Sequence, residues 1–163
     1  MTVRPFEEIL AEHGDVVMRV CRALLGPVDA DDAWAETFVS AMRAYPDLRA
    51  DSNVRGWLVT IAHRKSIDVI RARARAPHPV ADVPDRVSMG AADGCRVERD
   101  DELRAALQAL PPKQRGAVVY RYLADMPYAH VAAELEISEA AARRNAADGI
   151  ANLRAHYSRG TAR

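Results

Sequence analysis

Five cationic side chains lie within residues 63–75, in a segment whose first half is largely apolar. They are Arg64, Lys65, Arg71, Arg73 and Arg75, and Asp68 is the one acid among them. At about 100° of rotation per helical residue, Arg64, Arg71 and Arg75 form one narrow row beside Thr60, apart from a broad apolar face. Guanidinium groups suit phosphate contacts that hold a protein on nucleic acid. The row therefore predicts nucleic-acid binding, with a merely solvated charged face as the alternative.

The loop before this segment, LRADSNVRG, is short and polar. Ser52 and Asn53 can each donate and accept hydrogen bonds. Groups of this kind, beside an apolar wall, read the Watson–Crick edge of an extruded base. Alternatively, one of the two residues simply caps the helix that is expected to start at Val54.

Acidic side chains mark a second surface. Asp29, Asp32 and Glu36 are spaced three and four residues apart, so they share one helix face, and Asp29 is also a candidate N-cap. Carboxylates suit Mg²⁺, but no convergent His or second carboxylate cluster accompanies them. The five His are dispersed, and there is no H-E-x-x-H spacing, Ser-His-Asp set or Gly-rich phosphate loop. We therefore expect no metal, no cofactor, no small-molecule substrate and no enzymatic activity.

The whole-chain totals favour no particular partner. Among 163 residues, 23 Lys and Arg balance 23 Asp and Glu, and 49% are hydrophobic. Cys21 and Cys95 fit neither a metal-ligand spacing nor a disulfide framework. The sequence shows no signal peptide and no run of about 18 apolar residues. We expect a cytoplasmic protein that is not inserted in a membrane.

The elements that position these residues are predicted to be helices, because no convincing strand pattern is present. Apolar residues at helical spacing predict helices over residues 5–25, 29–45 and 54–75. The following segment, residues 76–100, contains Pro and Gly, is net acidic and lacks periodicity, as is typical of a linker.

Helical patterns resume after this segment. They predict helices over residues 101–110 and 113–123, and then a helix-turn-helix whose second helix is capped by Ser138. The sequence thus predicts an all-α chain of two small helical domains, over residues 1–76 and 101–163, with a flexible linker over residues 77–100.

Residues 29–75 resemble region two of the extracytoplasmic-function (ECF) group of bacterial sigma-70 factors. The matching elements are the acid-rich start with ETF, Ser52, the WL…IA pair, and Asp68 followed by Arg71. The resemblance implies that Ser52 and Asn53 form a pocket for a flipped base of the minus-ten promoter element. It implies that neighbouring DNA is contacted by Thr60, Arg64, Lys65, Arg71 and Arg75. It also implies that core RNA polymerase is bound through Asp29, Asp32 and Glu36.

The stretch ALPPKQRGAVVYRYLADMPYAHVAAELEISEAAARR resembles region four of the same group, in its LPPxQR, RYL, YAxVA and IS elements. The resemblance implies that the minus-thirty-five element is contacted by residues at the start of the recognition helix, namely Ser138, Glu139, Arg143, Arg144 and Asn145. The pattern departs from the family at Glu136, where Gly is usual, and at Ala141-Ala142, where Thr-Val is usual. It also departs at Asp148 and Gly149, which lie in a run that is normally rich in Arg.

The resemblance implies a transcription initiation factor that recruits core RNA polymerase to promoter DNA and helps to open it, with an anti-sigma factor as a further partner. The altered recognition helix motivates an alternative, a sigma-like interaction protein that binds polymerase or a regulator without reading a minus-thirty-five element. A metal-dependent nucleic-acid enzyme that uses the acidic face is a third and more remote hypothesis.

Overall fold

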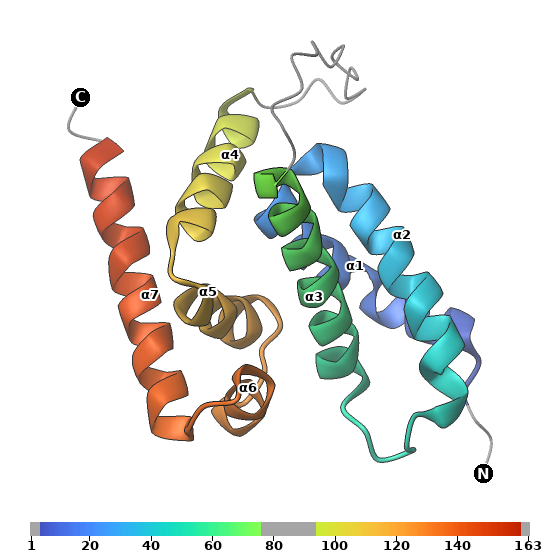
Figure 1. Cartoon of the computed structure of the whole chain (residues 1–163). Coiled ribbons are helices and arrows are strands. Elements are labelled where there is room, and N and C mark those ends of the chain that lie inside the picture. Colours follow the sequence, from blue (N-terminus) through green and yellow to red (C-terminus); the bar gives the residue numbers. More distant parts are fainter. Residues whose placement is uncertain (1–3, 76–93, 161–163) are drawn as a thin grey trace.

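The computed structural model describes residues 4–75 and 94–160, and every regular element in these ranges is helical (Figure 1). The first half contains α1 (Phe6–Leu25), α2 (Pro27–Ala44), a short 3₁₀ turn η1 (Tyr45–Asp47) and α3 (Val54–Arg75). The second half contains α4 (Gly94–Ala109), α5 (Pro112–Val118), a π-helical turn η2 (Val119–Leu123), α6 (Tyr128–Leu135) and α7 (Glu139–Gly160). The all-α prediction is confirmed.

The first three helices pack around an apolar core. Side chains one helical turn apart on α1, namely Val17, Val20 and Leu24, are fully buried, and they contact the buried Leu58 and Ala62 of α3 in one cluster. This spacing places one apolar stripe of each helix inward, as expected for helices that bury a single face. The predicted start of α3 at Val54 is confirmed, and the helix continues to Arg75, the last residue described before the gap.

The start of α2 differs from the expectation. Asp29 does not cap this helix, because α2 already begins at Pro27 with Gly26 at the N-cap. Proline suits the first helical position, where its missing N–H would have no partner, and Gly26 adopts a φ of 79° that favours glycine. Asp29 instead lies in the first turn, where its carboxylate forms an ion pair with Arg73 near the end of α3.

The second module begins earlier than the sequence predicted. Helix α4 already includes residues 94–100, which were assigned to the linker; no proline interrupts this stretch, so nothing in it prevents a helix. The rest of that segment, residues 76–93, lies outside the described residues. Helix α7 starts as expected, with the Ser138 hydroxyl accepting a hydrogen bond from the Ala141 N–H at 3.1 Å.

A π-helical turn interrupts the helix that was predicted over residues 113–123. The N–H of Ala124 donates to the carbonyl of Val119 at 3.1 Å, which is the five-residue spacing of a π-helix. The N–H of Met126 then donates a hydrogen bond to the carbonyl of Tyr120 at 3.0 Å. The helical turn is therefore wider at Tyr120, a residue that is only 2% exposed.

The two modules are packed against each other, with α4 and η2 both beside α1 (Figure 1). One core cluster contains buried residues of both, including Leu58 of α3 and Val119 of η2. The Gln108 amide of α4 donates to the carbonyl of Leu24 at the end of α1, at 2.7 Å. The sequence predicted the two modules but made no prediction about their packing.

Candidate nucleic-acid interface

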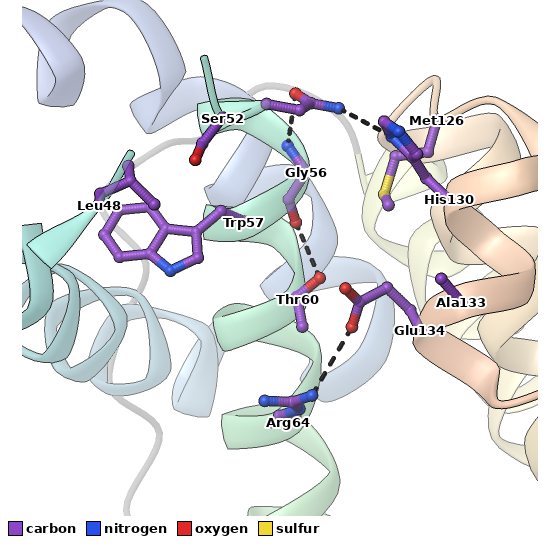
Figure 2. A pocket seen from close by; sticks show the side chains of 11 residues that line it. Leu48, Ser52, Gly56, Trp57, Thr60, Arg64, Met126, His130, Ala133 and Glu134 are labelled. Atoms are coloured by element: carbon purple, nitrogen blue, oxygen red, sulfur yellow. Dashed lines mark hydrogen bonds and ion pairs between the residues drawn. The ribbon is translucent and has the colours of Figure 1, made fainter. Parts of the chain in front are cut away.

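Asn53 caps helix α3. Its Oδ1 accepts a hydrogen bond from the N–H of Gly56 at 3.1 Å, which satisfies one of the otherwise unpaired donors of the first turn (Figure 2). The capping interpretation of this loop is therefore confirmed for Asn53. Its amide nitrogen remains directed outward and lies 3.5 Å from Nδ1 of His130 on α6.

A cavity of about 370 Å³ lies between this loop and α6 (Figure 2). On one side it is lined by Ser52, Asn53, Gly56, Trp57, Thr60 and Arg64, and on the other by Met126, His130, Ala133 and Glu134, with Leu48 at its edge. The first set contains an indole wall, a hydroxyl and an amide. Such a lining offers both stacking surface and hydrogen-bonding groups, which is what recognition of an unstacked base requires.

The basic row is present on α3 as expected. Arg64, Arg71 and Arg75 are all exposed, whereas Lys65 is half-buried. Thr60 does not accompany the row at the surface, since it is 6% exposed and its hydroxyl donates to the Gly56 carbonyl at 2.8 Å. The expectation that Thr60 contacts DNA therefore does not fit this arrangement, in which α6 and η2 cover that part of α3.

A second hollow, of about 200 Å³, lies along the same helix. It is lined by His63, Arg64, Ile67, Asp68 and Arg71. Two guanidinium groups outnumber the one carboxylate, so the hollow favours an anionic group such as a phosphate.

Two contacts from the second module reach the side chains of α3. A carboxylate oxygen of Glu134 lies 3.6 Å from the Arg64 guanidinium, and the phenol oxygen of Tyr120 lies 3.1 Å from Nδ1 of His63 (Figure 2 shows the first). Burial, with smaller contributions from the neighbouring Arg115 and Arg64, lowers the pKa of His63 to about 4. His63 is therefore neutral near pH 7.

The acidic face of α2 divides into two parts. Asp32 and Glu36 are exposed to solvent. Asp29 is instead half-buried, and its carboxylate is paired with Arg73. Exposed apolar side chains line the same side of the helix, namely Val28, Val39 and Met42. Within the described parts of the chain, no three His, Cys, Asp or Glu side chains gather as a metal site would require.

The start of α7 is already engaged in contacts of its own. Arg143 forms an ion pair with Glu139 at 2.6 Å, and its guanidinium lies over the Tyr128 ring at 4.6 Å. The Asn145 amide donates to the carbonyl of Ala141 at 2.8 Å. Arg144 is exposed, and in the described residues it has no ion pair or hydrogen bond that competes for its guanidinium. Of the five predicted residues here, Arg144 is the one presented freely.

Comparison with known families assigns both modules. Residues 9–76 match Sigma-70 region 2, and residues 100–153 match Sigma-70 region 4. The chain belongs to the ECF group of the sigma-70 family. The family resemblance and the two expected domains are thus confirmed in the order in which the sequence places them.

Two sigma factors illustrate the relationship. The ECF RNA polymerase sigma factor SigE of Mycolicibacterium smegmatis is 28% identical over an alignment of 155 residues, and the match covers 91% of this chain and 60% of SigE. SigM of Mycobacterium tuberculosis is 32% identical over 149 residues, or 91% of this chain and 74% of SigM. The chain therefore spans less than two thirds of SigE and about three quarters of SigM.

The fold is also similar to a solved structure, that of CnrH in complex with the cytosolic domain of CnrY. The TM-score is 0.72 at 25% identity, and the match covers 94% of this chain and 87% of CnrH. Since neither module alone amounts to 94% of the chain, the similarity includes the way in which regions two and four are placed.

The departures of this sigma factor in region four have structural reasons. Glu136 ends α6 with φ 54° and ψ 46°, the left-handed conformation for which glycine is the usual residue. Gly149 is buried where α7 crosses α5, and a Cβ there would lie 2.6 Å from the Val118 side chain and 3.2 Å from the Gln114 carbonyl. The helix tolerates glycine at this point because the two helices approach closely.

Several residues of the interface between regions two and four could not be found from the sequence pattern. Tyr120, His130 and Glu134 meet α3 from positions at least 57 residues away in the chain. Tyr128 was also missed as a partner of Arg143. A periodicity analysis finds faces of single helices, and it cannot pair the faces of two modules joined by a long segment.

Proposed function

We propose that this sigma factor binds core RNA polymerase and directs promoter-specific initiation of transcription in the cytoplasm. The observation that carries the proposal is the exposed row of Arg64, Arg71 and Arg75 on the helix that matches region two. The work consists of binding and strand separation, without covalent catalysis and without a cofactor. In the described ranges no helix has both the length and the apolar character needed to cross a bilayer.

The two regions divide the promoter between them. In region two, the row and Lys65 contact backbone phosphate, and the Ser52–Asn53 loop with the Trp57 wall receives a base of the minus-ten element. In region four, Arg144 at the exposed start of α7 contacts the upstream duplex, while Ser138 and Asn145 stabilise the helix that carries it.

A stripe on α2 docks on the polymerase. Val28, Asp32, Glu36, Val39 and Met42 are spaced so that they follow one side of the helix, and all of them are exposed. Large apolar side chains gathered on one exposed face are typical of a protein interface. The two carboxylates make this face negative, which suits a positively charged partner surface. Asp29 lies outside this stripe, and its ion pair with Arg73 joins α2 to α3.

Charge reversal tests the docking stripe. The double variant Asp32→Lys/Glu36→Lys should lose association with core polymerase, measured by co-purification, while its helix content by circular dichroism stays unchanged. The matched control is Glu7→Lys/Asp15→Lys, which makes the same charge change at exposed positions of α1. Core binding that survives the first pair would show that the stripe is not the dock.

A second candidate function is a sigma-like protein that binds polymerase or a regulator without reading an upstream element. It is favoured by the internal engagement of Glu139, Arg143 and Asn145. Run-off transcription with purified core polymerase on a promoter library distinguishes the two, because only a promoter-reading factor enriches a sequence. The fold is similar to that of the sigma factor RpoE, solved in complex with the anti-sigma factor NepR from Bartonella quintana, with a TM-score of 0.71 at 20% identity, which supports an anti-sigma factor as a further partner.

A further inference from the structure

We propose that the hollow along α3 binds a free oxyanion of the phosphate class, between Arg71 of region two and Arg115 of region four. The hollow has a volume of about 200 Å³, and both Arg64 and Arg71 line it. The ligand is a small ion in solution and not a promoter. The inference therefore goes beyond the proposed function and does not depend on it.

Arg115 is a buried cation without a counter-charge. It is 8% exposed, and in the described parts of the chain it forms no ion pair with a carboxylate. Its Nη1 donates a long hydrogen bond, of 3.4 Å, to the carbonyl of Gln108, and its Nε has no partner among the same residues. Burial, together with the charge of Arg71, lowers the pKa of this guanidinium. A buried charge is costly unless it is paired, so Arg115 favours an anion nearby.

Arg71 is a second cation without a partner carboxylate. Among the described residues, the ion pairs of α3 are made by Arg64 and Arg73 and leave Arg71 without one. The charges of Arg115 and Arg64 also contribute to the low pKa of His63, which lies in the wall of the hollow. This wall is therefore at positive potential. An anion placed there replaces repulsion between guanidinium groups with attraction to each of them.

Two carboxylates oppose an anion and determine where in the hollow it would bind. Asp68 also lines the hollow, and Glu134 lies 3.6 Å from the Arg64 guanidinium. Asp68 is exposed, so solvent and salt screen its charge. Because Arg64 is already partly neutralised by Glu134, we expect the anion on the side of Arg71 and Arg115.

The size of the hollow limits the anion to a small one. Pockets that hold drug-sized ligands have volumes of about 300–1,000 Å³. A volume of about 200 Å³ suits inorganic phosphate or pyrophosphate better than a nucleotide. Guanidinium groups bind phosphate oxygens through paired, charge-assisted hydrogen bonds. Since Arg71 and Arg115 belong to different regions, an ion bound to both should stabilise the folded chain.

Thermal unfolding of the full-length chain tests for the site. The midpoint is measured in sodium pyrophosphate and, at the same ionic strength, in sodium chloride, and the dissociation constant is measured by calorimetry. Pyrophosphate should bind as a single ion per chain and raise the midpoint above that in chloride. Equal midpoints in the two salts, with no saturable heat of binding, would overturn the proposal.

Substitutions test which residues hold the ion. Arg71→Gln, at an exposed position, and Arg115→Met, which removes an unpaired buried charge, should each weaken pyrophosphate binding about tenfold or more. Asp68→Asn should strengthen it about two- to fivefold. The matched control is Arg154→Gln, which removes one exposed positive charge from α7 and should bind as the wild type does. Wild-type affinity in Arg71→Gln, or an equal loss in Arg154→Gln, would overturn the site.

A DNA backbone is the other source of the same phosphate chemistry. The probe for it is a fluorescein-labelled random-sequence single-stranded 20-mer. If Arg115→Met loses pyrophosphate but retains the oligonucleotide, the free ion is the ligand. If Arg71→Gln loses the oligonucleotide while the wild type gives no response to pyrophosphate, the hollow belongs to the DNA interface and the proposal fails. A failure of run-off transcription would contradict the proposed sigma function and leave the anion site standing.

Discussion

The phenol oxygen of Tyr120 lies 3.1 Å from Nδ1 of His63, and the two rings tilt at 49° with centroids 4.8 Å apart. This contact joins η2 of region four to α3 of region two across 57 residues of chain. Burial, with smaller contributions from Arg115 and Arg64, lowers the pKa of His63 to about 4. A neutral ring can accept a hydrogen bond from the Tyr120 hydroxyl through Nδ1, whereas a protonated ring carries a proton on both nitrogens and cannot.

Acid should therefore weaken the packing of region four on region two. An exposed His titrates with a pKa of about 6.5, so the chain with separated regions binds more protons below that pH than the chain in which His63 is buried. The stability that the neutral His63 gives to this packing is complete above about pH 6.5 and is lost as the pH falls from there toward 4. Between pH 7.5 and 5.5 the ratio of packed to separated chain should fall about tenfold. The measurement is the radius of gyration against pH.

Two variants separate His63 from other titrating groups. His63→Phe keeps an aromatic ring against Tyr120 but cannot be protonated, so its radius of gyration should not change over this pH range. His156→Phe, at an exposed position of α7, should respond to pH as the wild type does. A pH response that persists in His63→Phe would assign the effect to another group.

Sequence periodicity predicted the helix boundaries correctly where the residues that determine a boundary belong to the helix itself. Helix α3 begins where the apolar and cationic pattern predicted, because its capping residue and its buried face are both local. The start of α2 was misassigned, since Gly26-Pro27 begins a helix two residues before Asp29. The packing of the two regions depends on contacts between distant segments, which a single sequence does not reveal.

Asn53 has two groups with separable roles. Asn53→Ala removes the cap and should lower the free energy of unfolding by about 1 kcal/mol. Asn53→Asp keeps an oxygen for the Gly56 N–H and should cost less than half as much. If the outward amide reads a base, both variants should lose preference at one minus-ten position, by about 1–3 kcal/mol. Chemical denaturation and a promoter-variant binding series provide the two measurements.

The comparison of Asn53→Asp with Asn53→Ala decides between the roles. Normal base preference in Asn53→Asp, with an equal loss on every promoter in Asn53→Ala, would leave capping as the whole contribution of this residue. A shared, position-specific loss would assign the amide to base recognition.

Glu136 should be replaceable by glycine with a gain in stability. Its left-handed conformation costs a residue with a Cβ about 1–2 kcal/mol, and the greater backbone freedom of glycine in the unfolded chain offsets part of this. Glu136→Gly should therefore raise the free energy of unfolding by about 1 kcal/mol in a denaturant titration. Glu136→Ala is the control, since it removes the carboxylate but keeps the Cβ. An equal gain from Ala would trace the effect to charge instead of backbone conformation.

The candidate site was predictable in part for a similar physical reason. Arg64, Arg71 and Arg75 were found because cations on one exposed line leave a pattern in the sequence. Thr60 shares that line, but its burial under region four depends on side chains from another module. Family resemblance names the residues that bind DNA, and it does not say which of them the free chain keeps covered.

Arg143 and Arg144 are neighbours on the recognition helix, and their substitutions should have different consequences. Arg143→Ala removes the ion pair with Glu139 and the stacking on Tyr128, so it should lower the free energy of unfolding by about 0.5–1 kcal/mol. Arg144→Ala removes an exposed side chain and should change it by less than about 0.5 kcal/mol. Thermal or chemical denaturation of both variants checks this difference.

DNA binding should show the opposite order. Arg144→Ala should weaken binding to upstream duplex by about 1–3 kcal/mol if its guanidinium reads a base edge, with a change in sequence preference there. Arg154→Ala, further along α7 and also exposed, is the matched control for loss of one positive charge. Arg64→Ala and Arg71→Ala should instead weaken binding on all promoters and flatten its salt dependence, because they remove phosphate contacts. Unchanged promoter output from Arg144→Ala, beside a clear loss from Arg64→Ala and Arg71→Ala, would leave region two as the reader and favour the sigma-like interaction protein.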